Sequence, residues 1–136
     1  MILRTALAAT IVLLTATAAA AADPAIPART TLASIPLGAE KLVARLDATR
    51  VDFAPGQVMP EHKHTVPVVC IVTRGAFVTS IGDSPLANAG PGAVTYEPPG
   101  VIIHFFRNAS TTEPAQLTCV LAAGKDDVQT SIMLAK

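Results

Sequence analysis

Short runs of β-branched and aromatic residues, each ended by a turn signal, limit most strongly how this chain can fold. The run "KLVARLDATRVDF" alternates apolar and polar residues, as a strand with one solvated face does. Gly, Pro, Asn or Asp separates the later runs, which are "AFVTSIG", "GAVTYEP", "VIIHFF" and "AQLTCVLAAG". No stretch after residue 40 has a helical period, although "DDVQTSIML" fits a helical turn or a last strand. This spacing predicts an all-β sandwich or barrel.

The start of the chain, "MILRTALAATIVLLTATAAAAADPAIP", has a different composition. Arg4 precedes an apolar run and a series of alanines that ends at Ala22, which is the pattern of a secretory signal peptide. An uncleaved membrane anchor is the alternative, because residues 6–22 are nearly long enough to cross a bilayer. The weakly apolar alanines and threonines and the abrupt stop at Asp23 favour cleavage. We therefore expect residues 1–22 to be a signal peptide and the protein to be periplasmic or secreted.

Residues 23–136 are the expected mature domain, since removing 22 of the 136 residues leaves 114. A chain of this length can bury one core without help. The ten Lys and Arg residues include Arg4, so nine remain against ten Asp and Glu, with no block of like charge. This balance argues against nucleic acid and an acidic membrane surface as partners.

Histidine is rare in this chain, and its placement carries the functional signal. His62 and His64 lie one residue apart, and His104 follows in a later predicted strand. Residues i and i+2 of a strand project from the same face, so His62 and His64 point together and Lys63 points away. Two imidazoles from one strand and a third from another can bind a metal ion. A lone histidine on a β face is more often structural, but three in this pattern favour a metal site.

Two glycine-anchored motifs surround these histidines. In the first, Gly56 is followed by five residues, His62, one residue and His64, and the motif closes on Gly75. The second motif begins at Gly92, five residues before "PPG" at positions 98–100, and continues to His104 and Asn108. Together they resemble the cupin superfamily over about residues 56–108. The resemblance implies a double-stranded β-helix, or jelly-roll barrel, with His62, His64 and His104 as metal ligands.

Two departures from the cupin pattern bear on the metal. In the first motif three or four residues separate the second histidine from a Glu, and the corresponding positions in this chain are Val68 and Val69. In the second cupin motif two residues separate the last glycine from the histidine, whereas this chain has three between Gly100 and His104. A β-bulge must absorb the extra residue. Three histidines without a carboxylate predict a divalent ion such as iron, zinc, copper or nickel, with manganese disfavoured. A degenerate site that binds no metal is the alternative.

Few other residues offer chemistry near such a metal. Tyr96 and Glu97 are most simply strand-end and turn residues, while Glu61 and Arg107 are expected to point away. The pocket would be apolar, and the reaction would depend on the metal and on what it binds. We therefore expect a metal-dependent enzyme, dioxygenase-like, that acts on a small apolar molecule. The alternative is a non-catalytic periplasmic protein that binds a metal or a small ligand.

The two cysteines and one apolar run complete the expectations. The resemblance places Cys70 and Cys119 on neighbouring strands, where a disulfide is possible in an exported protein. Two buried free thiols are the alternative.

The run "VPVVCIV" at 66–72 is apolar on both alternating faces, which predicts a homodimer formed through that sheet. Asn108-Ala109-Ser110 matches a glycosylation acceptor, but Asn108 is better interpreted as the structural residue that ends the second motif.

Overall fold

A computed structural model describes residues 28–134, so the predicted signal peptide (1–22) lies outside the described residues. The described chain is all β. Its strands are β1 (Arg45–Phe53), β2 (Val58–Met59), β3 (His62–His64), β4 (Val68–Arg74), β5 (Phe77–Ile81), β6 (Ala87–Ala89), β7 (Val94–Glu97), β8 (Ile102–Asn108), β9 (Ala115–Ala123) and β10 (Ser131–Met133). The segment "DDVQTSIML" was compatible with a helical turn or a last strand, and its residues Ser131–Met133 form strand β10. Between residues 28 and 134, no helix is long and apolar enough to cross a membrane.

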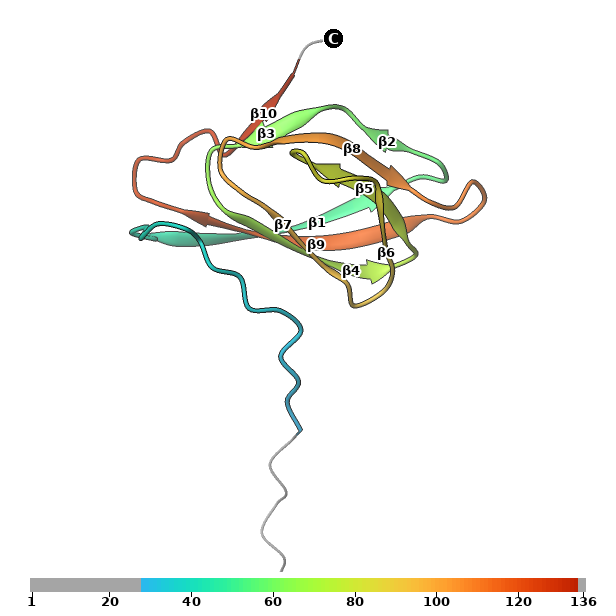
Figure 1. Ribbon diagram of the computed structural model, residues 1–136, viewed down its shortest axis with the longest axis horizontal. Coiled ribbons are helices and arrows are strands. Elements are labelled where there is room, and N and C mark those ends of the chain that lie inside the picture. The colour runs from blue at the N-terminus through green and yellow to red at the C-terminus, as the bar shows by residue number, and fades with distance from the viewer. Residues whose placement is uncertain (1–27, 135–136) are drawn as a thin grey trace, which may run out of the picture.

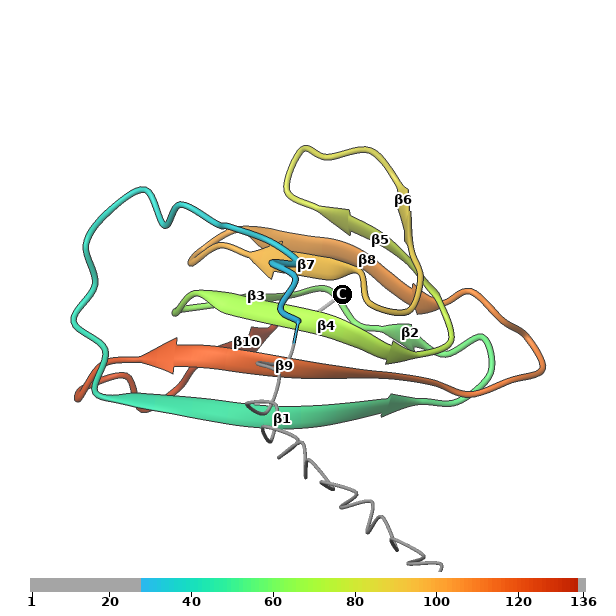
Figure 2. The ribbon, with the colours of Figure 1, turned by 90° about the horizontal axis from the view of Figure 1, so that it is seen from below.

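The strands form two antiparallel sheets packed face to face, as Figures 1 and 2 show. The four-stranded sheet has the order β1-β9-β4-β7. The six-stranded sheet has the order β10-β3-β8-β5-β6, and β2 also pairs with β8. Neighbouring strands are mostly distant in sequence, as in β4 beside β9. This is the jelly-roll arrangement that the sequence predicts, and the prediction is confirmed.

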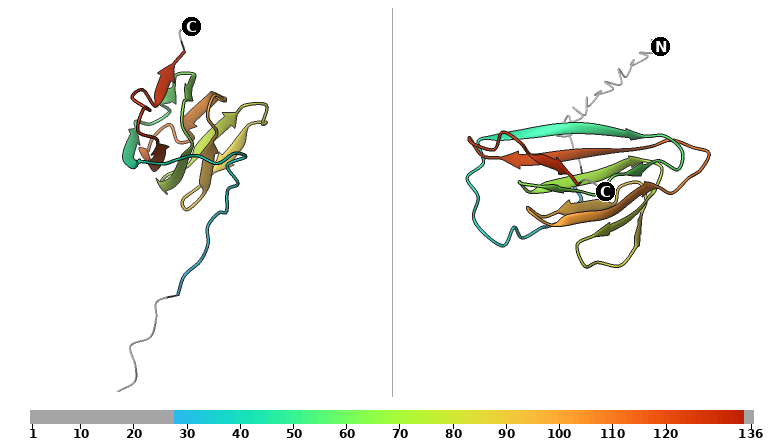
Figure 3. Two further views of the ribbon diagram at one scale, coloured as in Figure 1. Left: turned by 90° about the vertical axis from the view of Figure 1, so that its left-hand side faces the viewer. Right: turned by 90° about the horizontal axis from the view of Figure 1, so that it is seen from above.

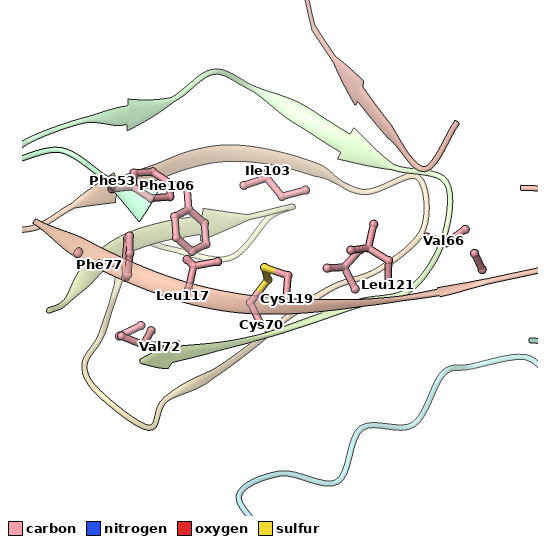
Figure 4. Packing of buried hydrophobic residues seen from close by; sticks show 14 residues of the cluster. Phe53, Val66, Cys70, Val72, Phe77, Ile103, Phe106, Leu117, Cys119 and Leu121 are labelled. Atoms are coloured by element: carbon pink, nitrogen blue, oxygen red, sulfur yellow. A yellow bond between two sulfur atoms is a disulfide. The ribbon is translucent and has the colours of Figure 1, made fainter. Parts of the chain in front are cut away.

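The core lies between the sheets because the strands alternate as the sequence predicts. In β4, Val68, Cys70 and Val72 are at most 3% exposed, whereas Ile71 is 37% exposed on the outer face. An aromatic cluster fills one end of the core (Figure 4). Its ring centroids are 5.1–6.0 Å apart, which is within the usual range for favourable ring contacts, and its members are Phe53, Phe77 and Phe106.

Gly75 explains why the first motif closes on glycine. Its φ is +70°, in the left-handed region that residues with a Cβ rarely adopt. A Cβ at this position would lie 2.8 Å from the Cβ of Ala115. Glycine therefore permits both the turn from β4 to β5 and the close approach of β9.

The longest strand pair is β1 with β9, which run side by side in Figure 3. Residues 28–44, which precede β1, form no strand and are mostly exposed. One ion pair connects this segment to the sandwich, with Lys41 Nζ 2.7 Å from an oxygen of Asp127. The hydrogen bond from Lys41, with a second from the backbone N–H of Gly124, holds the pKa of Asp127 below its ordinary value.

Asn108 ends β8 and is a structural residue. It is fully buried, and its amide donates to the carbonyl oxygens of Ala54 (3.0 Å) and Glu113 (2.7 Å). Its side-chain oxygen accepts the N–H of Ser110 at 3.0 Å. Asn108 thus ties three chain segments together, and its burial in the folded protein leaves no room for a glycan.

We expect Asn108→Ala to lower the free energy of unfolding by about 3 kcal/mol, because three hydrogen bonds are lost and buried carbonyl groups are left without a donor. Urea unfolding followed by circular dichroism measures the change. Asn88→Ala, at an exposed position in β6, is the matched control and should change stability by less than about 0.5 kcal/mol. Equal effects of the two substitutions would contradict this role for Asn108.

Candidate metal centre

Strand β3 places His62 and His64 on the inner face of the six-stranded sheet. They are 6% and 8% exposed, and Lys63 between them is only partly buried. The strand is held on both sides, because it pairs with β10 through all three residues and with β8 through His62 and Lys63. The i, i+2 spacing therefore does what the sequence predicts and directs both imidazoles into the interior.

Backbone carbonyl groups fix the orientation of both rings. Nδ1 of His62 lies 2.9 Å from the carbonyl oxygen of Pro60, and Nδ1 of His64 lies 3.1 Å from that of Thr130. A carbonyl oxygen only accepts, so each Nδ1 carries the proton. The hydroxyl of Ser131 lies 2.9 Å from the same nitrogen of His64. Each ring thus presents Nε2 to the interior, in the arrangement typical of histidines that bind metal.

Glu97, at the end of β7, completes a group of three possible ligands. Its Oε2 lies 2.8 Å from Nε2 of His64 and 4.0 Å from Nε2 of His62. The carboxylate is buried, and one ligand atom from each of the three residues lies within 4.8 Å of the others. No Lys or Arg pairs with this buried carboxylate among the ion pairs of the described chain.

The position of Glu97 explains the missing motif carboxylate. Val68 occupies the place where the first motif has Glu, and it is buried on the inner face of β4. In the β4–β7 ladder, the residue directly opposite Val68 is Glu97. Directly opposed residues project from the same face of a sheet with their Cβ atoms about 5 Å apart. The carboxylate is therefore supplied from the neighbouring strand.

The structure does not bring His104 to this group, which differs from the predicted three-histidine set. The side chain of His104 is 48% exposed, and its Nδ1 lies 2.9 Å from Oε1 of Glu61 on the outside of the sheet. The cause is the extra residue of the second motif. The β5–β8 register passes from Ser80 opposite Phe105 to Ile81 opposite Ile103, so a bulge falls at His104.

The bulge also changes which residues of β8 face inward. The sequence places Ile102, His104 and Phe106 on one face. In the structure Ile103 and Phe106 are buried at 1% and 3%, and His104 faces outward. Arg107 is exposed as expected, with its guanidinium 5.6 Å from the ring centroid of Phe105. Glu61 is exposed as predicted, and its partner is His104.

The donor set of this group fits a divalent metal ion. Two neutral imidazoles and one carboxylate form a set that holds catalytic iron(II), zinc and related ions in proteins. Nε2 of His64 and Oε2 of Glu97 lie 2.8 Å apart, and both are atoms that bind metal ions in proteins. The sequence disfavours manganese because it predicts no carboxylate in the donor set. Glu97 adds a carboxylate to that set, so manganese is no longer disfavoured.

The metal group borders a cavity of about 250 Å³ between the sheets. Its wall is mainly apolar, with Val51, Phe53, Met59, Val68, Phe106, Leu117 and Leu121 among the lining residues. The disulfide-bonded Cys70 and Cys119 also border it. The exposed lining residues Thr49 and Met133 come from β1 and β10, which are edge strands of the two sheets. The cavity therefore opens between these two edges, and Tyr96 does not border it.

Comparisons with known proteins support this description. A sequence model of the family described as "Cupin domain" matches residues 49–121, which include His62, His64 and Glu97. A search of curated proteins gives no match.

Three solved structures illustrate the similarity of fold. An oxalate oxidase in complex with the substrate analogue glycolate has 23% identity and a TM-score of 0.56, covering 65% of this chain and 46% of that chain. The DMSP lyase DddQ from Ruegeria pomeroyi has 18% identity and a TM-score of 0.55, covering 65% and 42%. A double-stranded β-helix protein from Klebsiella pneumoniae has 21% identity and a TM-score of 0.55, covering 67% and 76%.

The match to the two enzymes is partial, since this chain covers less than half the length of each. Their likeness to this chain is one of fold.

Proposed function

The chain belongs to the cupin family, and from that premise we propose that it is an exported metal-dependent enzyme, dioxygenase-like, acting on a small and largely apolar molecule. The observation that carries the proposal is the group of His62, His64 and Glu97 at the edge of an apolar cavity. A metal ion held by only these three residues would keep coordination positions open for a substrate and for dioxygen. A structural site would normally be closed by four protein ligands.

The chain's own residues would perform three tasks in such a reaction. The carbonyl groups of Pro60 and Thr130 keep the imidazoles of His62 and His64 in one orientation, which preserves the geometry of the site. Glu97 contributes one negative charge. The apolar wall excludes water and strengthens electrostatic interactions inside the cavity. A redox-active divalent metal, when bound, would polarise a substrate oxygen and exchange electrons with dioxygen.

The cavity offers little other acid–base chemistry. Apart from the metal group, the only ionisable lining residue with a formal charge is Asp47, and its carboxylate is paired with Arg45 at 2.9 Å. General acid–base catalysis requires a group within hydrogen-bond reach of the reacting proton. Among the described lining residues, only the metal group and the ion-paired Asp47 could serve as such a group. This supports chemistry centred on the metal over a proton-shuttling reaction.

Nitric oxide binding to the iron(II)-loaded protein tests the proposal. Nitric oxide binds to iron(II) only where a coordination position is open, and the complex gives a characteristic electron paramagnetic resonance signal. We expect the signal in the wild-type protein and its loss in His64→Ala, with His104→Ala as a matched histidine control. A metal-loaded protein that gives no signal would overturn the enzyme proposal in favour of a binding protein.

Export to the periplasm is part of this proposal. The disulfide between Cys70 and Cys119 supports it, because such bonds persist in oxidising compartments. We expect protein recovered from its native compartment to begin at Asp23. Intact mass spectrometry measures this directly. A chain that starts at Met1 in a membrane fraction would contradict signal-peptide cleavage.

We also propose a homodimer formed through the outer face of the four-stranded sheet. Val69 and Ile71 of β4 project to this face, and Val120 of β9 and Leu46 of β1 lie on the same face. Of these, Leu46 is 68% exposed and the residues Ile71 and Val120 are each 37% exposed. An apolar sheet face of this kind is a favourable surface for symmetric association.

We expect light scattering to report twice the monomer mass for the wild type and the monomer mass for Ile71→Glu. The buried carboxylate would make association unfavourable. Leu86→Glu is the matched control, because Leu86 is 65% exposed in the loop before β6 and should leave the dimer intact. A monomeric wild type at high protein concentration would contradict the proposal.

A further inference from the structure

The charges around the cavity restrict what can bind to its metal. A divalent ion carries two positive charges, and Glu97 cancels one of them. Among the other described lining residues only Asp47 carries a formal charge, and it is paired with Arg45. The lining contains no Lys or Arg that could pair with a second negative charge of a ligand. A ligand with one negative charge therefore gives a neutral complex, while a dianion leaves an uncompensated charge next to apolar side chains. Burying an unpaired charge is strongly unfavourable.

The nearest cation at the cavity mouth is already engaged. Arg45 precedes the lining residue Asp47 in β1, and its Nε donates to that carboxylate at 2.9 Å. The rest of its guanidinium donates to the carbonyl oxygens of Asp127 (2.7 Å) and Gly124 (3.4 Å). Arg45 is thus engaged by three partners and does not border the cavity. A second anionic group would find no cationic side chain among the described lining residues.

The size and wall of the cavity restrict the rest of the ligand. Its volume of about 250 Å³ lies below the roughly 300–1,000 Å³ that is usual for drug-sized ligands. Beyond the metal group, the wall continues with the side chains of Val51, Phe106, Leu117 and Leu121. These surfaces favour a compact hydrocarbon body and offer no partner to a polar one.

From these observations we propose that the substrate is a small monoanion that binds the metal through its charged group and carries an apolar body without a second charge. Enolates and 2-oxo acids with branched alkyl chains belong to this class, whereas dicarboxylates do not. The inference rests on the proposed metal enzyme, and it adds the substrate class. Monoanions are favoured over dianions because the lining residues of the cavity include no Lys or Arg.

Two 2-oxo acids with the same metal-binding head provide the test. The probe 4-methyl-2-oxopentanoate has an apolar tail, and 2-oxoglutarate has a carboxylate in its tail. Each is titrated into cobalt(II)-loaded protein, and the visible absorption of cobalt reports binding without any turnover. We expect 4-methyl-2-oxopentanoate to bind at least about tenfold more tightly. Equal or tighter binding of 2-oxoglutarate would overturn the inference.

A variant at the cavity mouth tests whether the missing cation causes the difference in affinity between the two acids. Thr49 is exposed, borders the cavity and projects from the inner face of β1, so its replacement should not disturb folding. Thr49→Lys introduces the missing cation and should reduce the difference between the two ligands to about threefold or less. Thr49→Gln, similar in length and uncharged, should leave the difference unchanged. An unchanged difference in Thr49→Lys would also overturn the inference.

The outcomes separate this inference from the proposed function. If the protein takes up no cobalt(II), the proposed metal enzyme fails. If cobalt(II) binds and neither acid changes its spectrum, the metal site stands and the substrate class is wrong.

Discussion

Substituting alanine for His64 is expected to abolish stoichiometric metal, and His62→Ala and Glu97→Ala should have the same effect. Each change leaves two protein ligands, which is too few for tight binding in a cavity that opens to water. Affinity should fall by more than about a hundredfold, because loss of a supporting hydrogen-bond partner alone costs roughly 10–100-fold. Metal content after competition with a chelator, measured by mass spectrometry, gives the result.

His104→Ala is the matched control in this series, because it removes an exposed imidazole from the outside of the same sheet. It should retain the wild-type amount of metal. Ser131→Ala is an intermediate case, since it removes the hydroxyl group 2.9 Å from Nδ1 of His64 and leaves the Thr130 carbonyl in place. We expect it to weaken binding without abolishing it. Loss of metal in His104→Ala, with retention in Glu97→Ala, would show that the three histidines are the ligands.

Local spacing was sufficient to predict that His62 and His64 point into the interior together. His62 and His64 share a face wherever the strand lies, because alternation is a property of the strand itself. The same alternation places Val68 and Cys70 together on the inner face of β4. It also predicted the all-β fold, since turn residues divide the chain into runs too short for anything but strands.

The third candidate ligand, Glu97, depends on information that spacing does not contain. Glu97 enters the site because β7 pairs with β4 in a register that sets it opposite Val68, and that register is a tertiary property. The signal available in the sequence was a carboxylate at the end of an apolar strand, next to Pro98. This signal would have predicted Glu97 as a ligand only if the pairing of β7 with β4 had been known.

His104 shows a related limit. The motif contains one extra residue, and counting reveals the excess without revealing where the strand absorbs it. A bulge nearer to Gly100 would have turned His104 inward. The structure has the bulge at His104 itself, so Ile103 faces the core and the histidine faces solvent. A shift of one residue in register exchanges the faces of a strand, which makes such sites hard to predict from spacing alone.

The disulfide has the second large expected effect. Cys70 and Cys119 lie directly opposite each other in the β4–β9 ladder and are bonded. As Figure 4 shows, the bond lies in the core between the two sheets. It connects residues 49 positions apart, so it constrains a long loop of the unfolded chain. The chain-entropy model gives about 4 kcal/mol for a loop of this length.

We therefore expect the double variant Cys70→Ala, Cys119→Ala to unfold at a temperature roughly 15 °C below the wild type, from that energy and the usual entropy of unfolding of a domain this size. Calorimetry in the absence of metal measures the shift. The wild type with a strong reductant should approach the variant's melting temperature, while the variant should not respond to reductant. Because His62, His64 and Glu97 lie on other strands, the variant should still bind metal at 25 °C. Two free thiols in the native protein, detected by thiol titration under denaturing conditions, would contradict the bond and with it the predicted shift.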